Sequence, residues 1–344
     1  MFLLHLTGHS KEFIMAEKFV VLGSNSFSGA SFSDFILDKG AEVVGISRSP
    51  EPSEVFLPYK WGKHNSHFQF YDLDINHNLN QIMEIIYDFK PDYVVNFAAQ
   101  GMVAQSWQYP EHWFMTNVVS MVKLHDQLRH CDFLKKYVHI TTPEVYGSCE
   151  GYVTESHAFN PSTPYAVSRA ACDLSLKSFF RAYQFPVVFT RAANVFGPGQ
   201  QLYRIIPRTI LYIKMGKKLQ LHGGGHSVRS FIHIRDIADG TLRVARQALP
   251  GETYHFATKE TISIRNLVEL ICQKMEVNFE EVVEISEERL GKDQNYLLDS
   301  TKARKTLGWK DKINLETGID ETIRWVNNHF EEIQKQPFEY IHKP

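Results

Sequence analysis

The chain has 344 residues, 43% of them hydrophobic, and its 37 Lys and Arg nearly balance its 39 Asp and Glu. This length supports one large or two modest domains with a sizeable core, and the near-zero charge gives no electrostatic footprint for nucleic acid or an anionic membrane. The four cysteines are widely spaced without a Cys-x-x-Cys pair, so the sequence indicates neither a zinc site nor a disulfide framework. We expect a cytoplasmic protein with reduced thiols and no bound metal.

The first credible structural element begins near Met15. Residues 1–14 lack the basic segment and small-residue cleavage site of a signal peptide, and we expect them to form a disordered extension. No apolar run approaches the roughly 20 residues that a membrane-spanning helix needs. The sequence therefore predicts no membrane segment.

Residues 18–22 predict a short buried strand, followed by a loop over 23–29 and a helix over 30–40. Strand, glycine turn and helix in this order are typical of the phosphate-binding turn of a nucleotide-binding βαβ unit. Gly23 permits the tight turn, and Ser26 places a hydroxyl where a pyrophosphate would approach. Two glycines are a weak signal, so a plain strand-to-helix turn is the alternative.

The second predicted strand, residues 41–46, ends in Ser47 and Arg48. An acidic residue at this position selects NAD, whereas an arginine accommodates the 2′-phosphate of NADP. We therefore expect NADP as the favoured cofactor, with NAD as the alternative. A solvent-exposed arginine without a ligand is the competing interpretation.

After the fourth predicted strand, the small Ala98 and Ala99 fit a backbone that lies against a dinucleotide.

Residues 138–169 carry the strongest chemical signal. An apolar strand at 138–140 runs into two threonines and a glutamate, and Tyr165 then opens a helix with Arg169 four residues later. This spacing places the phenol and the guanidinium on one helix face, one turn apart. Because a nearby cation favours the phenolate, the pattern suits a tyrosine that exchanges a proton near neutral pH. A surface tyrosine and arginine on an ordinary helix is the bland alternative.

This segment resembles the active site of the extended short-chain dehydrogenase/reductases, specifically the nucleotide-sugar epimerases and dehydratases. That family has Thr or Ser at a strand end and Tyr-x-x-x-Lys on the next helix, which correspond here to Thr142 and Tyr165-x-x-x-Arg169. Its dTDP-glucose 4,6-dehydratase branch reads Thr-Asp-Glu where this chain has Thr142, Pro143 and Glu144. The resemblance is closest to the dTDP-glucose and GDP-mannose 4,6-dehydratases.

Further motifs follow in the family's order from about residue 17 to 330. They include Asn-x-Ala-Ala-Gln at 96–100, the Asn-x-Phe-Gly-Pro stretch from Asn194, and the glycine-rich run with an arginine at 223–236. The resemblance implies a Rossmann-type doubly wound parallel sheet with a smaller C-terminal α/β substrate-binding domain. The Rossmann domain would span residues 15–197 with a returning segment at about 231–260. The substrate domain would comprise 198–230 and 261–335, and family members commonly form homodimers through two Rossmann helices.

The resemblance also assigns residues to the site. It makes Thr142, Glu144, Tyr165 and Arg169 catalytic. The dinucleotide would be bound by Gly23, Ser26, Phe27, Ser28, Gly29, Ser47, Arg48, Asp72, Leu73, Phe97, Ala98, Ala99, Tyr165 and Arg169. The sugar nucleotide would be bound by Gln100, Ser106, Asn194, Arg204, Arg229 and Arg289.

The implied reaction is 4,6-dehydration of a nucleotide sugar to a 4-keto-6-deoxy product. Tyr165 and Thr142 would act at the 4-hydroxyl, and Glu144 would take the C5 proton. Two departures touch this chemistry, because Pro143 replaces the acid that protonates the leaving hydroxyl and Arg169 is not a conservative replacement for lysine. A nucleotide-sugar C4 epimerase or related oxidoreductase is the first alternative, and a non-catalytic NAD(P)-binding homologue is the second.

Overall fold

The computed structural model describes residues 16–62, 65–287 and 297–343, so the expected extension at 1–14 lies outside the described residues. Its centre is a seven-stranded sheet in the order β3-β2-β1-β4-β5-β7-β12, and every neighbouring pair in it is parallel. The strands are β1 (Lys18–Leu22), β2 (Glu42–Ser47), β3 (Phe68–Asp72), β4 (Tyr93–Asn96), β5 (Lys136–Ile140), β7 (Val187–Ala192) and β12 (Thr253–Phe256). The strand order reverses between β1 and β4, which confirms the predicted doubly wound sheet.

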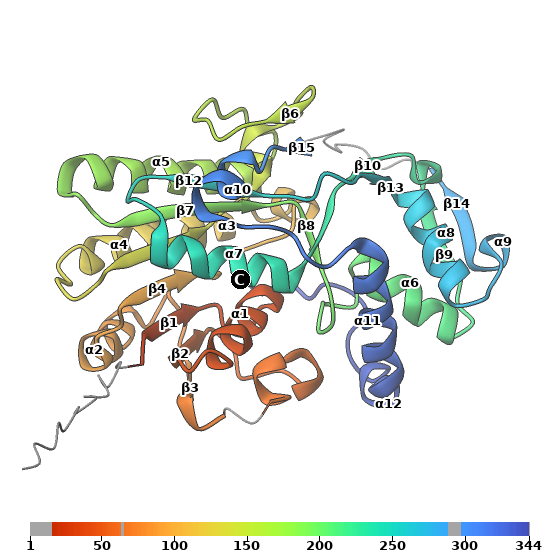
Figure 1. Ribbon diagram of the computed structural model, residues 1–344, viewed down its shortest axis with the longest axis horizontal. Coiled ribbons are helices and arrows are strands. Elements are labelled where there is room, and N and C mark those ends of the chain that lie inside the picture. The colour runs from red at the N-terminus through yellow and green to blue at the C-terminus, as the bar shows by residue number, and fades with distance from the viewer. Residues whose placement is uncertain (1–15, 63–64, 288–296, 344) are drawn as a thin grey trace, which may run out of the picture.

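Helices cover both faces of this sheet (Figure 1). Phe19 and Val21 of β1 join the core beneath α1 (Phe27–Leu37) and α7 (Ile234–Gln247). Val20 and Leu22 point to the opposite face, where they share a core with α2 (Leu79–Phe89), α4 (Met121–Leu128) and α5 (Pro164–Tyr183). Because both faces are buried, β1 is an unbroken apolar run rather than an alternating one.

A smaller lobe gathers at one end of the sheet, on the right of Figure 1. Its helices α6 (Ile205–Lys214), α8 (Ile264–Lys274) and α11 (Leu315–Asn328) share a separate apolar core. The parallel pair of β9 (Leu219–His222) and β14 (Val283–Ser286) lies beside it. The smaller lobe is therefore itself α/β, as expected.

Short elements connect these layers. They are α3 (Pro110–Phe114), α9 (Phe279–Val282), α10 (Thr301–Leu307), α12 (Phe330–Ile333), β6 (Tyr152–Val153), β8 (Asn194–Phe196), β10 (Val228–Arg229), β11 (Phe231–His233), β13 (Ile262–Ser263), β15 (Leu297–Leu298), the π-helix η5 (Met115–Ser120) and the 3₁₀ turns η1 (Glu54–Phe56), η2 (Pro58–Lys60), η3 (Asn65–His67), η4 (Ala104–Trp107), η6 (Pro143–Tyr146) and η7 (Gly223–Gly225). Across the described ranges, no helix has the length and apolar character needed to cross a membrane.

The first helix begins earlier than the sequence pattern predicts, at Phe27 rather than residue 30. Ser26 explains the difference, because its hydroxyl accepts a hydrogen bond from Gly29 N at 3.0 Å and so caps the helix. The glycine-containing loop is therefore shorter than expected, and its second half is already helical.

Candidate active site

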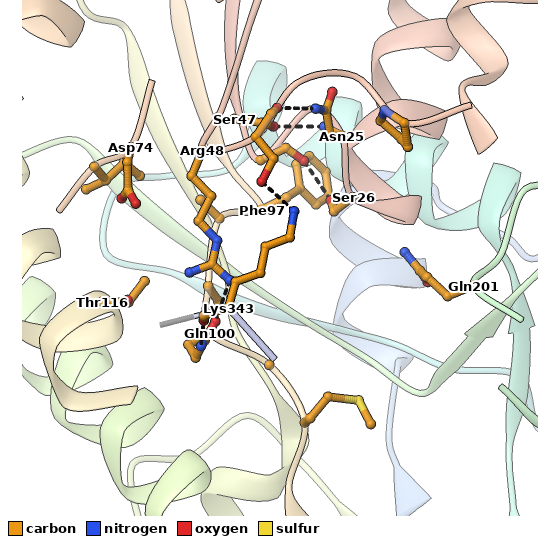
Figure 2. Close-up of a pocket in the computed structure, with 18 of the residues that line it drawn as sticks. Asn25, Ser26, Ser47, Arg48, Asp74, Phe97, Gln100, Thr116, Gln201 and Lys343 are labelled. Carbon is orange, nitrogen blue, oxygen red and sulfur yellow. Dashed lines mark hydrogen bonds between the residues drawn. The ribbon is translucent and has the colours of Figure 1, made fainter. Parts of the chain in front are cut away.

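A cleft of about 410 Å³ opens where the strand order reverses, at the carboxyl ends of β1, β2 and β4 (Figure 2). This is where open α/β sheets bind ligands. One side of the cleft is formed by the turn after β1 and the other by the loop after β4. Gly23 has φ +79°, and a Cβ there would lie 2.6 Å from Ala98 N. Only glycine therefore allows these two loops to meet and leave a cradle for a dinucleotide, so the residues present fit a nicotinamide cofactor.

Ser26 behaves differently from the expectation that its hydroxyl donates to a pyrophosphate. The hydroxyl donates to Gly23 O at 2.7 Å while it accepts from Gly29 N. Its proton is thus used inside the turn. The first-turn N–H groups of α1, which include those of Phe27 and Ser28, are the donors that a helix N-terminus offers to an anion.

The end of β2 is tied to the same turn. Asn25 N donates to Ser47 Oγ at 2.9 Å, and the Asn25 side chain donates to Ser49 O at 2.9 Å. Arg48 reaches across the cleft, and its guanidinium donates to Gln100 Oε1 at 2.9 Å (Figure 2). Side-chain hydrogen bonds therefore connect the end of β2 both to the turn after β1 and to the loop after β4.

The reactive wall begins where β5 ends. Thr142 is extended and caps η6, accepting from Glu144 N at 3.3 Å. Pro143 occupies the first position of η6, where its fixed φ and missing N–H cost nothing. The local geometry thus explains why proline is tolerated between two residues of the motif.

Tyr165 lies in the first turn of α5, which Thr163 caps by accepting from Ala166 N at 3.2 Å. Burial raises the pKa of the Tyr165 hydroxyl, whereas Arg169 lowers it and Glu144 raises it further. A hydrogen bond with the Thr142 side chain also lowers the pKa. The structure therefore brings the other three predicted catalytic residues within interaction distance of the Tyr165 phenol.

Arg169 is only 4% exposed, and its guanidinium donates to Ile140 O. Behind it, Asp173 accepts from Arg191 at 2.6 Å and from Thr141 Oγ1 at 3.0 Å. Burial alone would raise the pKa of Asp173, but Arg191, His139 and Arg169 together outweigh it and hold the pKa below its ordinary value. This buried ionic layer braces the end of β5 against α5, and no sequence signal indicated it.

The same layer contains His125, His139 and Cys172, whose nearest side-chain nitrogen and sulfur atoms lie within 4.8 Å of one another. Their sequence spacing gave no sign of this grouping. Burial lowers the pKa of both imidazoles and raises that of Cys172 to about 12. The positive Arg169 and the negative Asp173 both act on His139 and Cys172, so charges of opposite sign flank this group.

Other residues assigned to the cofactor take different positions. Leu73, Phe97, Ala98 and Ala99 line the cleft. Asp72 is exposed at the end of β3 and lies outside the cleft lining, whereas Asp74 two residues later is part of it.

The residues assigned to the sugar nucleotide are more scattered. Gln100 and Arg204 line the cleft. Ser106 is buried and donates to Val103 O at 2.6 Å, and Asn194 donates to Ser230 O at 3.2 Å. Arg229 donates to Val228 O at 2.8 Å and lies outside the cleft lining. Arg289 falls outside the described residues.

The sequence reasoning missed several cleft residues. Asn25, Ser49 and Asp74 are neighbours of predicted residues, so a wider reading of the strand ends would have included them. Tyr340 and Lys343 also line the cleft, but they lie far along the chain from every motif. Nothing in the sequence pattern pointed to them.

The chain is similar in sequence and fold to known proteins. The family model described as GDP-mannose 4,6 dehydratase matches residues 20–322. A dTDP-glucose 4,6-dehydratase of Streptomyces antibioticus is 34% identical over 251 residues, which cover 72% of this chain and 74% of that protein.

Two solved structures extend the comparison. A dTDP-glucose 4,6-dehydratase from Streptomyces venezuelae, with NAD bound, has a TM-score of 0.84 at 26% identity and covers 91% of this chain and 98% of its own. A UDP-N-acetylglucosamine 4-epimerase from Methanobrevibacter ruminantium has a TM-score of 0.82 at 26% identity, covering 92% and 100%. Because the family model spans most of the chain, this protein belongs to the GDP-mannose 4,6-dehydratase family of NAD-dependent epimerases and dehydratases.

Proposed function

We propose that this chain is a nucleotide-sugar 4,6-dehydratase, which converts a sugar nucleotide to its 4-keto-6-deoxy derivative. The observation that carries the proposal is the grouping of Thr142 and Glu144 around the Tyr165 phenol, which also senses the charge of Arg204 in the cleft lining. The dTDP-glucose 4,6-dehydratases among the relatives support it. A nicotinamide cofactor held by the cleft lining would supply the chemistry that the side chains lack, namely the uptake and return of a hydride.

Tyr165 holds the proton of the sugar 4-hydroxyl during oxidation. Its burial disfavours the phenolate and raises the pKa of the hydroxyl, and Arg169 together with Thr142 offsets part of this effect. The positive charge of an oxidised nicotinamide would lower the same pKa further. Tyr165 is therefore placed to act as base when C4 is oxidised and as acid when the carbonyl is reduced.

Glu144 is the base for C5. Oxidation at C4 acidifies the C5–H bond, and removal of that proton by Glu144 forms the C5–C6 double bond as the C6–O bond breaks. The departing hydroxyl needs a proton, which Pro143 cannot give. Glu144 therefore passes the proton it took from C5 to the leaving oxygen, so that water departs and the carboxylate is restored. When the hydride returns to C6, C5 takes up a proton that comes from solvent.

A C4 epimerase is the alternative function. Epimerases among the structural neighbours and the missing acid at Pro143 favour it, because epimerisation needs Tyr165 and Thr142 but no C5 base. A panel of sugar nucleotides incubated in D₂O separates the two functions by mass spectrometry and NMR. Loss of water with deuterium at C5 is the expected result, whereas an isotope-free C4 epimer would contradict the dehydratase. No product from any nucleotide would favour a non-catalytic homologue.

We also propose that NADP is the preferred cofactor, because Arg48 directly follows β2, at the position that accommodates a 2′-phosphate. Replacing Arg48 by aspartate should shift the preference towards NAD, as measured by the ratio of the two dissociation constants. Tightly bound NAD in the wild-type protein, with no effect of this substitution, would contradict the proposal.

A homodimer is a further part of the proposal. Large apolar side chains are exposed on η5 and α5, among them Met115, Val119 and Leu174. Burying this surface against a second copy would remove it from water. Light scattering coupled to gel filtration should give twice the chain mass.

The four cysteines are all free, which suits the reducing cytoplasm where we place the protein. We retain the division into a dinucleotide domain (15–197 and about 231–260) and a substrate domain (198–230 and 261–335).

A further inference from the structure

Residues 338–343, here called the cleft segment, cross the dinucleotide cleft, although they lie far along the chain from the strands of the sheet. It leaves the smaller lobe where Arg208 donates to Phe338 O and Glu339 Oε1, both at 2.8 Å. Tyr340 then packs edge-on against Tyr203, with 5.8 Å between ring centroids. The first half of this crossing is thus held by side chains of the folded protein.

His342 anchors the segment on α3. Its ring is parallel to that of the fully buried Trp113, with an angle of 2° and a centroid distance of 5.1 Å. Its Nε2 lies 2.9 Å from His112 Nδ1, so one imidazole donates and the other accepts. The side chain of Gln100, which is 1% exposed, donates to Lys343 O at 2.6 Å. Stacking and directed hydrogen bonds therefore fix the backbone on both sides of Lys343.

Lys343 points to the end of β2. Its Nζ donates to Ser49 Oγ at 2.7 Å, and both Lys343 and Arg48 line the cleft (Figure 2). The acidic residue that follows this strand end, Glu51, is bound by Lys60 at 2.6 Å and by Tyr59 at 2.8 Å. Two cations thus converge on one strand end, while the adjacent carboxylate is engaged elsewhere. Such convergence suits a doubly charged anion.

We propose that the cleft segment is an integral wall of the dinucleotide site and that Lys343, together with Arg48, binds the phosphate monoester on the adenosine ribose of NADP. The inference rests on the proposed NADP preference and adds a residue that no strand-end motif contains. Arg48 approaches this phosphate from β2 and Lys343 from the opposite wall. Cofactor selection is then a property of two distant segments of the chain, since Ser49 and Lys343 are 294 residues apart.

The test is equilibrium binding by calorimetry, independent of turnover, on the full chain with NADP, NAD and adenosine 2′,5′-bisphosphate. Lys343→Gln should weaken NADP and the bisphosphate about tenfold or more, because it removes a charge-assisted contact to phosphate. NAD affinity should stay within about twofold. Lys335→Gln is the matched control, since it removes the same charge from an exposed side chain that pairs with Glu332 at 3.9 Å. Unchanged NADP affinity in Lys343→Gln would overturn the inference.

A second variant tests whether the cleft segment binds the cofactor or blocks its entry. A chain ending at Glu339 should lose the discrimination between NADP and NAD. If it bound both cofactors more tightly, the cleft segment would be an obstruction and the inference would be wrong. If the wild type preferred NAD, both the NADP proposal and this inference would fail, whereas the dehydratase proposal would still be decided by its product. If NADP were preferred and Lys343→Gln were silent, this inference alone would fail.

Discussion

The reactive wall, residues 142–169, lies outside the cleft lining, and it is built in a different way from the wall formed by the cleft segment. The reactive wall comes from one continuous stretch, residues 142–169, in which a strand end, a 3₁₀ turn and a helix start follow one another. The wall formed by the cleft segment comes from contacts between distant parts of the chain, such as Gln100 with Lys343, 243 residues apart. Chemical groups that depend on local geometry leave a motif, whereas groups placed by long-range packing leave none.

A buried hydrogen-bond chain joins the two walls. Gln100, which holds the cleft segment, donates its backbone N–H to Asn117 Oδ1 at 2.7 Å. The Asn117 amide donates in turn to Ser168 Oγ at 3.0 Å, and Ser168 precedes Arg169 in α5. Asn117 lies in the π-helix η5, a kind of distortion that often marks functional sites. Buried hydrogen bonds therefore connect the cleft segment to helix α5.

The largest expected effect lies in the reactive wall. Tyr165→Phe removes the proton-transfer group and should lower kcat by about 10²–10⁴-fold. Its NADP dissociation constant should be nearly unchanged, because the cleft lining remains. Steady-state turnover and calorimetric binding measure the two quantities. Undiminished turnover would remove Tyr165 from the mechanism.

Glu144→Gln should divide the reaction rather than abolish all of it. Oxidation at C4 does not need Glu144, so the absorbance of reduced nicotinamide should accumulate. The 4-keto-6-deoxy product should be missing, because the amide cannot take the C5 proton. An almost silent substitution is what an epimerase predicts, and rapid-scanning spectroscopy with product analysis distinguishes the two.

Asn117→Ala tests the link between the walls. It leaves buried partners at Gln100 and Ser168 without their hydrogen bonds and should lower the free energy of unfolding by about 1–3 kcal/mol. Gln127→Ala on the exposed side of α4 is the control, expected to change stability by no more than about 0.5 kcal/mol. Urea unfolding measures both. Equal effects in the two variants would mean that the chain of hydrogen bonds does not stabilise the site.

The smallest effect concerns pH and His342. Burial lowers the pKa of His342, and His112 and Arg48 lower it further. Tyr340 and Gln100 also face the ring, with uncharged polar groups 3.4 and 3.3 Å from its Nδ1. Docking therefore favours the neutral imidazole, so its contribution is complete above the ordinary pKa of about 6.5 and is lost as the pH falls below that value.

NADP affinity measured at several pH values tests this expectation. The wild type should bind a few-fold more tightly than His342→Gln above about pH 7, and the difference should shrink in acid. The comparison between variants cancels the titration of the cofactor's own phosphate. A difference that does not vary with pH would show that protonation of His342 does not release the cleft segment.

The sequence alone determined the sheet and the order of its reactive residues. The apolar run at 18–22, Gly23 and the Thr142-to-Arg169 spacing each depend on local backbone geometry, which short patterns encode. The comparisons confirm the family and the dehydratase reading drawn from these residues. The individual roles of the site residues remain predictions.

Only the tertiary structure decided which polar groups share the cleft. It placed Asp74 rather than Asp72 in the lining, directed the Ser26 proton into its own turn, and brought Lys343 to the end of β2. Each outcome depends on the direction of a side chain or on packing between distant segments, and neither follows from residue type or spacing. Local chemistry is encoded in short stretches of the chain, whereas the shape of the cofactor site exists only once those stretches have packed together.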